Sequence, residues 1–557
     1  MVVVVVAEEE EAVAEVAATR DQARMKGWHL FGIAALFWAA IFLPGLGSTE
    51  LKGEEGRRIL PARTMLRSGE WIVPFSEGKP YSRKPPGINW AIAASFSLTK
   101  TQNEWTARLP SVLSVLAGTL VILGTSRRML GDAGALVAAL SFLACVAQVD
   151  KGRLAEIEPL YVGLTAIAIA LWASLWQGES NRWLTWTVPW LFLGLAMLTK
   201  GPLHLLFVYG IICAVLRDAR QLRQLVSPPH IAGILIMAGI FAPWAIANAK
   251  RSAALGPDQA SSQTVWIQQL TERIDPRGID WNSYFLVPIE GVLNLAPWII
   301  LPIVFWRKIG PWSRNEPGRT GSLIRGLKLG ILITFLVVSF IPESRPRFTM
   351  PMMGAAAILN GWVAAQAWER HPDALKFWWR HANFGAALIL GLALLVAPWV
   401  IPDAPRALGF AGGILIALGL LLLARKDNPL PRLAGATAAN VAAAIFILVV
   451  DLGPVRVKSE NVRPPGRILN EALPEGATLT IFKPGPQPFL FYIDAPYTIA
   501  DHPSEIPADT AYILLRPEHR DRVLSRKSIV KNGDPETIRE VEAKDGKRYQ
   551  LLRITRM

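Results

Sequence analysis

The sequence predicts an all-α polytopic membrane protein with about thirteen transmembrane helices, followed by a small α/β domain at its C-terminal end. Over half of its 557 residues are apolar. They occur in blocks of about 16 to 20 residues between short charged loops, which is the length that a helix needs to cross the hydrocarbon layer. The blocks are continuous rather than alternating, so they favour helices over a β-barrel. Many tryptophans flank the blocks, as in an interfacial aromatic belt.

The first element is an acidic stretch at residues 1–27 that carries no cleavage signature, and we expect a cytoplasmic extension rather than a signal peptide. A transmembrane domain is expected at 28–451. Its spans are expected at 28–46, 109–126, 132–149, 158–176, 183–199, 203–216, 230–249, 286–306, 327–342, 349–368, 384–401, 407–424 and 434–451.

Lys and Arg in the short loops predict the orientation. Basic residues precede the first span and follow the second, sixth, eighth and twelfth, so they share one side if the N-terminus is cytoplasmic. Because the number of spans is odd, the tail at 452–557 then lies outside. We therefore expect a multi-pass protein of the bacterial inner membrane with a periplasmic C-terminal domain.

Three segments on the outer side are long enough to carry function: the loops at 47–108 and 250–285, and the tail. The tail contains strand-like runs separated by Pro and Gly turns, which indicates a small mixed α/β domain. These runs are Thr478–Lys483, Phe489–Asp494 and Ala511–Arg516.

The first outer loop is rich in Arg and Lys, although the charge rule disfavours basic residues outside. Two interpretations stay open: the basic residues hold lipid headgroups, or they bind an anionic group such as a phosphate. Glu54 and Glu55 lie among them. An ionised carboxylate can accept a proton from an approaching hydroxyl, but the two acids could equally neutralise Arg57 and Arg58.

Further charged residues are expected at the outer ends of later spans. Glu156 and Glu158 are two residues apart, so on a helix they point in different directions and at most one faces a cavity. The same surface is expected to carry Lys200, Glu343, Arg345 and Arg347.

A series of short motifs runs through the first 220 residues or so. The outer loop contains Gly-Glu-Glu-Gly-Arg-Arg at 53–58, Gly-Lys-Pro-Tyr at 78–81 and Lys-Pro-Pro at 84–86. Arg-Leu-Pro-Ser follows at 108–111 and Leu-Thr-Lys-Gly-Pro at 198–202. In their order and spacing these motifs resemble glycosyltransferase family 39, which includes the protein O-mannosyltransferases and the lipid A aminoarabinose transferases.

The resemblance implies a GT-C fold and an inverting transfer of a sugar from a polyprenyl (undecaprenyl) phosphate to a lipid or protein acceptor at the outer leaflet. Membrane lipids are the expected surroundings, and no nucleic acid is expected. A transporter or lipid flippase, or a non-catalytic membrane scaffold, stays open as an alternative. The surface location of the charges and the absence of an inverted repeat argue against a transporter.

The resemblance also implies roles for particular residues. Glu55 matches the acid of the family's first loop, with Glu54 beside it as the other candidate, and Glu158 matches a position that usually holds Asp. Arg83 replaces a Glu found in many relatives, so no cofactor is certain and a divalent metal stays open. The candidates for holding the donor phosphate are Lys84, Arg57, Arg58, Tyr81, Lys200 and Arg345.

Overall fold

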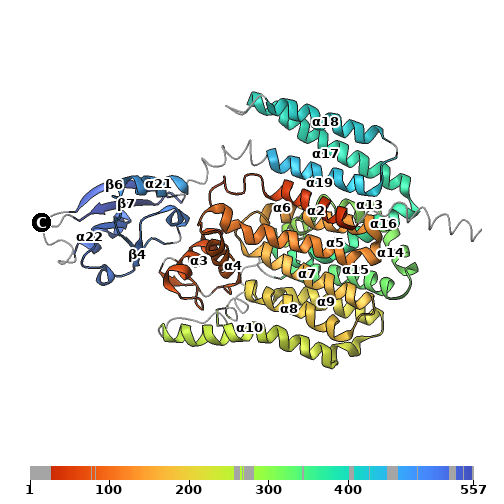
Figure 1. Cartoon of the computed structure of the whole chain (residues 1–557), viewed down its shortest axis with the longest axis horizontal. Helices are drawn as coiled ribbons and strands as arrows, with labels where there is room; N and C mark the ends of the chain where they lie inside the picture. Colours follow the sequence, from red (N-terminus) through yellow and green to blue (C-terminus); the bar gives the residue numbers. More distant parts are fainter. Residues whose placement is uncertain are drawn as a thin grey trace, which may run out of the picture.

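The computed structural model contains a helical bundle and a smaller sheet domain that lies against one end of it (Figure 1). It describes residues 27–554 except 77, 82, 256–263, 266–267, 269–280, 342–343, 401–406, 426, 448–461, 486, 526–534 and 544. The expected outer loop at 250–285 therefore falls mostly outside the described residues.

The bundle confirms the predicted helical class. Among the described residues, six helices are long and apolar enough to cross a membrane, and four shorter helices are also apolar. In lipid such segments satisfy their backbone hydrogen bonds only as helices. The bundle helices are α2 (Gly27–Phe42), α5 (Glu104–Leu143), α6 (Val146–Lys151), α7 (Ile157–Gln177), α8 (Arg182–Lys200), α9 (Leu203–Asp218), α10 (Pro228–Ala254), α12 (Trp281–Leu293), α13 (Ile300–Val304), α14 (Trp306–Asn315), α15 (Gly318–Ser339), α16 (Met353–Arg370), α17 (Pro372–Val400), α18 (Ala407–Ala424) and α19 (Leu430–Phe446).

Three expected spans differ from the structure. The span at 109–126 and most of that at 132–149 lie in α5, which Gly131 divides with a non-helical φ of 66° and ψ of 175°, and the end of the second span reaches into α6. The span expected at 286–306 is not one helix but is broken into α12, α13 and the start of α14. Pro297 lies in this break, where its missing N–H cannot continue a helical ladder.

The segment 47–108, expected only as a loop, contains two helices and a short hairpin. These are α3 (Gly56–Ser68), β1 (Phe75–Ser76), β2 (Lys79–Pro80) and α4 (Gly87–Thr99). Helix α4 packs on α8 at Gly87, where an added Cβ would lie 2.6 Å from the carbonyl oxygen of Leu198. The segment is therefore a folded cap that fits closely on the bundle.

The tail forms a five-stranded mixed sheet of order β4-β3-β5-β7-β6, flanked by α21 (Arg463–Ala472) and α22 (Arg520–Leu524). The runs expected at 478–483 and 511–516 contain β3 and β5. The prediction of a strand at 489–494 is wrong. Pro488–Tyr492 instead forms a 3-10 helix whose consecutive apolar side chains are buried. The strands are β3 (Leu479–Phe482), β4 (Tyr497–Ala500), β5 (Tyr512–Leu515), β6 (Glu536–Glu542) and β7 (Arg548–Arg553).

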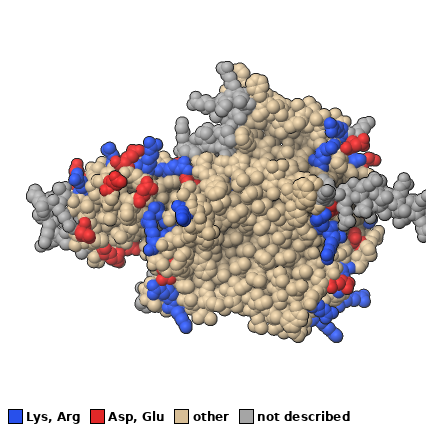
Figure 2. Space-filling model, in the orientation of Figure 1, with Lys and Arg blue, Asp and Glu red and all other residues tan. Residues whose placement is uncertain are grey.

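Charged side chains gather at two opposite margins of the bundle, with a broad uncharged band between them (Figure 2). This is the distribution expected of a protein that spans a bilayer, because the hydrocarbon layer excludes charge. One charged margin faces the tail, on the side of α3 and α4 (Figures 1 and 2).

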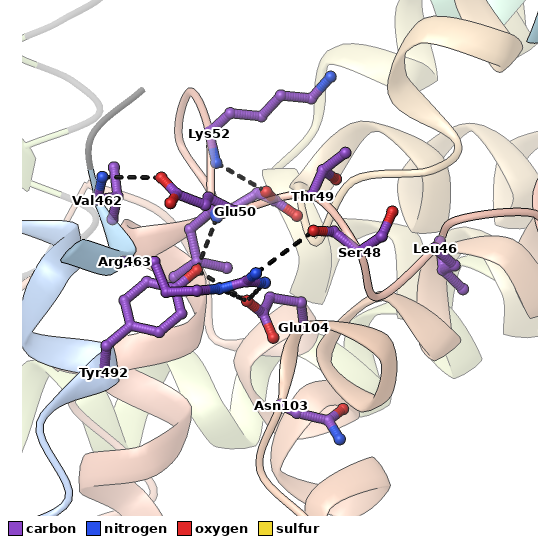
Figure 3. Close-up of polar contacts among 12 residues, drawn as sticks. Leu46, Ser48, Thr49, Glu50, Lys52, Asn103, Glu104, Val462, Arg463 and Tyr492 are labelled. Atoms are coloured by element: carbon purple, nitrogen blue, oxygen red, sulfur yellow. Dashed lines mark hydrogen bonds and ion pairs between the residues drawn. The ribbon is translucent and has the colours of Figure 1, made fainter. Parts of the chain in front are cut away.

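The tail contacts the folded segment 47–108 through buried polar groups. Figure 3 shows Glu104 between Arg463, with which it forms an ion pair, and the hydroxyl of Tyr492, which donates to it over 3.0 Å. The backbone N–H of Val462 donates to Glu50 over 2.8 Å. Arg63 of α3 donates to the carbonyl oxygens of Phe491 and Ile493 at 2.9 and 3.2 Å. The two parts are thus joined directly beside the candidate site.

Candidate active site

Helix α3 begins at a buried ion pair between Glu55 and Arg108 of α5. Glu55 is 0 % exposed. Its two oxygens accept hydrogen bonds from Nε and Nη2 of Arg108 at 2.7 and 2.8 Å. They also accept from the backbone N–H groups of Lys52 and Ala155 at 2.9 and 2.8 Å. Because four donors occupy this carboxylate, its place in the structure is that of an anchor, not of a group free to meet a substrate.

Arg108 extends this anchor to the chain that leaves the first span. Its Nη1 donates to the carbonyl oxygens of Leu46 and Thr49 at 2.6 and 3.0 Å, and its Nη2 donates to that of Glu50 at 3.0 Å. A planar guanidinium with five N–H groups suits this clustering of acceptors. The ion pair fixes the start of α3 relative to α5, and with it the position of the neighbouring Glu54.

Glu54, the neighbour of Glu55, lies among basic side chains and is partly exposed. Its carboxylate is 29 % exposed and lies 2.8 Å from Arg58 and 3.4 Å from Arg347, with Arg57 at 3.9 Å. Burial raises the pKa of Glu54, but Arg58 and Arg347 outweigh that effect and hold the pKa below its ordinary value. The geometry therefore favours Glu54 over Glu55 as the ionised carboxylate that an incoming group can reach.

Glu158, in the first turn of α7, forms the second acidic point of the cluster. It lies 3.2 Å from Nζ of Lys200 and 3.7 Å from Nε of Arg347. Lys200 also lies over the rings of Tyr161 and Phe348, each at 5.3 Å from the ring centroid. Since Arg347 contacts both Glu54 and Glu158, it joins the two carboxylates into one network.

Two guanidinium groups of this network keep unused hydrogen-bond donors. Arg58 donates to Glu54 and, over 3.0 Å, to the hydroxyl of Tyr81. Within the described part of the chain, the buried Nε atoms of Arg58 and Arg347 have no hydrogen-bond acceptor. A buried donor without an acceptor is costly. The Nε of Arg58 is therefore suited to bind an oxyanion, whereas the Nε of Arg347 faces the carboxylate of Glu158 at 3.7 Å.

A cavity of about 340 Å³ adjoins Arg347. Arg345 also lines it but is exposed, and it shares none of the contacts that the structure gives to Glu54 and Glu158. The structure thus brings Arg347, two residues further on, into the cluster in place of the expected Arg345. The cavity lining also includes Asp150, Lys151, Glu290 and Asn294.

Glu156 is the residue immediately before α7 and lies close to this cluster. It is 3 % exposed, and one oxygen lies 3.7 Å from Nζ of Lys151. Burial raises the pKa of Glu156 to about 7, an effect that Lys151 opposes and Glu158 reinforces. The expectation that Glu156 and Glu158 point in different directions holds, since only Glu158 contacts Lys200 and Arg347.

Two expected residues remain. Arg57 is exposed and lies 3.9 Å from Glu54, and Lys84 is half-buried just before α4. Sequence reasoning missed Arg108 as the partner of Glu55. The signal was present, because Arg108 belongs to one of the matched motifs, but nothing in the spacing indicates that it pairs with a residue 53 positions away.

Across the described ranges there is no group of three or more His, Cys, Asp or Glu side chains placed to hold a metal ion. The acids of the cluster lie instead beside cations, namely Arg58, Arg347 and Lys200. The donor set therefore fits the binding of an oxyanion better than that of a resident cation.

The chain is similar in sequence to known membrane glycosyltransferases. The family model for dolichyl-phosphate-mannose-protein mannosyltransferases matches residues 83–246. The undecaprenyl phosphate-α-4-amino-4-deoxy-L-arabinose arabinosyl transferase of Edwardsiella ictaluri is 25 % identical over 69 % of this chain and 67 % of its own. A second such transferase, from Proteus mirabilis, is 27 % identical over 59 % of this chain and 58 % of its own.

Among solved structures, the chain is similar to ArnT from Cupriavidus metallidurans bound to undecaprenyl phosphate. The TM-score is 0.69 at 18 % identity, and the alignment covers 96 % of this chain and 99 % of that one. This similarity extends over both the bundle and the tail, and it confirms the predicted fold.

Proposed function

We propose that this chain, a GT-C glycosyltransferase of the aminoarabinose-transferase type, moves a sugar from a polyprenyl phosphate to an acceptor oxygen at the membrane surface. The relatives named above are transferases of a sugar on undecaprenyl phosphate. The observation that carries the proposal is the network of Glu54, Glu158, Arg58, Arg347 and Lys200 at the end of the bundle that faces the tail.

The proposed chemistry is a single displacement. An acceptor oxygen attacks the anomeric carbon while the bond from that carbon to the phosphate oxygen breaks, and the phosphate leaves with the electron pair. A carboxylate takes the proton of the acceptor. No general acid is needed, because a phosphate is a good leaving group and its charge can be stabilised by preorganised cations. A single displacement inverts the configuration at the anomeric carbon.

Each residue of the network then has a role. Glu54, ionised and partly exposed, binds and deprotonates the acceptor. Arg58 receives the phosphate on its unused Nε donor, and Arg347, whose Nε faces Glu158, contributes its positive charge. Glu158 keeps Lys200 and Arg347 in place. Lys84, just before α4, adds charge for the donor phosphate.

We propose that transfer does not require a divalent metal. Two guanidinium groups and one ammonium group already provide the positive charge that a metal ion would supply to the leaving phosphate. The expected result is an unchanged transfer rate in excess EDTA. Loss of activity with EDTA and its recovery with added Mg²⁺ or Mn²⁺ would contradict this part of the proposal.

We also propose that the acceptor is a lipid or protein on the periplasmic side of the inner membrane. The tail and the network lie at the same end of the bundle (Figure 1). This end is periplasmic if the basic loops at the other end are cytoplasmic.

The test is purification of the chain with native lipids, followed by mass spectrometry of bound polyprenyl phosphates and a transfer assay with the donor found. We expect a polyprenyl-phosphate sugar to co-purify. Replacement of Lys84 by Ala should weaken donor binding about tenfold or more, since it removes a charge-assisted contact to phosphate. Unchanged donor affinity in Lys84→Ala would overturn that assignment, and the absence of transfer to any lipid or protein fraction would overturn the function.

A further inference from the structure

A second cavity, of about 420 Å³, lies among α17, α18 and α19, far from the network described above. These three helices lie side by side at one edge of the bundle, and the turn from α18 to α19 lies at the end opposite the tail (Figure 1). The proposed sugar transfer does not use this cavity, so the residues that line it need another explanation.

The walls of the cavity are apolar and hollowed by small residues. Leu415, Leu418 and Leu422 contribute the wall on α18. Gly435, Ala436 and Ala439 contribute the wall on α19, where their lack of bulk leaves the space open. Such a wall is complementary to an acyl chain rather than to a polar solute.

The mouth of the cavity is cationic. Arg425 follows the last turn of α18 and Arg432 lies in the first turn of α19, and both line the cavity and are exposed. None of the described lining residues is acidic. Two guanidinium groups at the boundary of a membrane helix pair are complementary to a phosphate at headgroup depth.

A buried acceptor lies beside the two arginines. Asn428 is 0 % exposed, and its Nδ2 donates to the carbonyl oxygens of Leu422 and Arg425 at 2.9 and 2.7 Å. Its Oδ1 is buried and, over the residues that the structure describes, accepts no hydrogen bond. Asn428 also lines the cavity. An unsatisfied amide oxygen at this place needs a donor, such as a hydroxyl group.

We propose that this cavity binds an anionic glycerophospholipid with a hydroxylated headgroup, from the leaflet opposite the tail. Its phosphate lies between Arg425 and Arg432, a headgroup hydroxyl donates to Oδ1 of Asn428, and one acyl chain fills the groove between α18 and α19. The lipid thereby ties the α17–α18 hairpin to α19. The site is separate from the donor site, so it stands or fails independently of the proposed transfer reaction.

The test uses the full-length protein, delipidated in detergent and titrated with phosphatidylglycerol under native mass spectrometry. Each arginine contributes about fivefold to the affinity for an anionic phospholipid. We therefore expect Arg425→Gln/Arg432→Gln to bind about thirtyfold more weakly. The matched control is Arg307→Gln/Lys308→Gln, which removes two exposed charges at positions that do not line the cavity and should bind as the wild type does.

A second variant tests the groove without changing any charge. Ala436→Phe fills the cavity, and it should lose phosphatidylglycerol while keeping both arginines. Phosphatidylcholine, which lacks both the net charge and the hydroxyl groups, should bind the wild type far more weakly. Equal binding of the two lipids, wild-type binding by the double arginine variant, or a preference of the site for undecaprenyl phosphate would each overturn the proposal.

Discussion

Glu54 and Glu55 are adjacent in the chain but have opposite environments. Glu55 points into the bundle, where Arg108 and two backbone N–H groups occupy it. Glu54 lies at the surface of the network, beside Arg58 and Arg347. Successive residues at the start of a helix point about 100° apart, so only one of two adjacent acids can face the site. The residue types alone do not distinguish them.

The two acids should therefore respond differently to the same substitution. Glu54→Gln removes the proton acceptor and should lower turnover about a hundredfold or more, with little change in the unfolding temperature. Glu55→Gln leaves Arg108 buried without its counter-ion and should destabilise the fold by about 3–5 kcal/mol. Turnover with matched donor and acceptor, together with thermal unfolding in detergent, measures both effects. Wild-type turnover in Glu54→Gln would exclude it as the base.

Glu156 predicts a pH dependence of stability. Burial raises its pKa from 4.5 to about 7, so between these values the folded protein retains a proton that the unfolded chain has lost. The resulting contribution to stability is complete below about pH 4.5 and is lost as the pH rises through about 7. We expect the unfolding temperature of the wild type to fall over this range by more than that of Glu156→Gln, whose amide does not titrate. Parallel melting curves across the range would contradict the raised pKa.

Helix α4 shows how a secondary-structure element positions the site. It follows Lys84 and packs at Gly87 against the backbone of Leu198 and Thr199, immediately before Lys200. Only a residue without a Cβ permits this approach. The contact fixes the position of the segment that carries Lys84 relative to the end of α8, which carries Lys200.

Gly87→Val should separate the two elements. The added side chain meets backbone, which cannot move as a flexible side chain can, and overpacking of this kind costs about 1–3 kcal/mol. We expect a lower unfolding temperature and a raised KM for the donor. The matched control is Gly239→Val in α10, where no heavy atom lies within 4 Å of the added Cβ, and it should behave as the wild type does. Equal effects of the two variants would show that the α4–α8 contact has no special importance.

At the scale of the whole molecule, the tail holds the folded segment 47–108, which carries Glu54 and Arg58, in position. Arg63 of α3 reaches the tail while Glu55, at the start of the same helix, reaches α5. Glu104 at the start of α5 is held by Arg463 and Tyr492 of the tail (Figure 3). The position of Glu54 is therefore supported from both sides.

Loss of the hydrogen bonds from Arg63 to the tail should make the tail more mobile and lower the turnover of the enzyme. Arg63→Met leaves the carbonyl oxygens of Phe491 and Ile493 without their donor, and we expect faster amide hydrogen exchange in α3 and in the tail strands. Turnover should fall severalfold. Arg467→Met, which removes only an exposed pair with Glu471 inside α21, is the control and should change neither quantity. Unchanged exchange in Arg63→Met would show that the tail docks independently of this contact.

The sequence by itself determined the helical membrane class, most of the span positions, strands β3 and β5 of the tail, and the set of charged residues from which the site is built. These follow from local properties, namely the length of apolar blocks, short alternating runs and motif order. The helices inside segment 47–108 were missed because their residues lack a long apolar period, and the break at Pro297 was missed because the apolar run continues through it. The charged edge strand β6 was missed because its side chains are mostly exposed.

Only the tertiary structure decided which of the two acids lies in the charged network, that Arg347 rather than Arg345 joins Glu54 to Glu158, and that Glu55 pairs with Arg108. Each of these contacts joins residues that are 53 to 293 positions apart. The direction of a side chain depends on where its helix begins and on what packs behind it. Those are properties of the assembled bundle, and no local pattern in the chain encodes them.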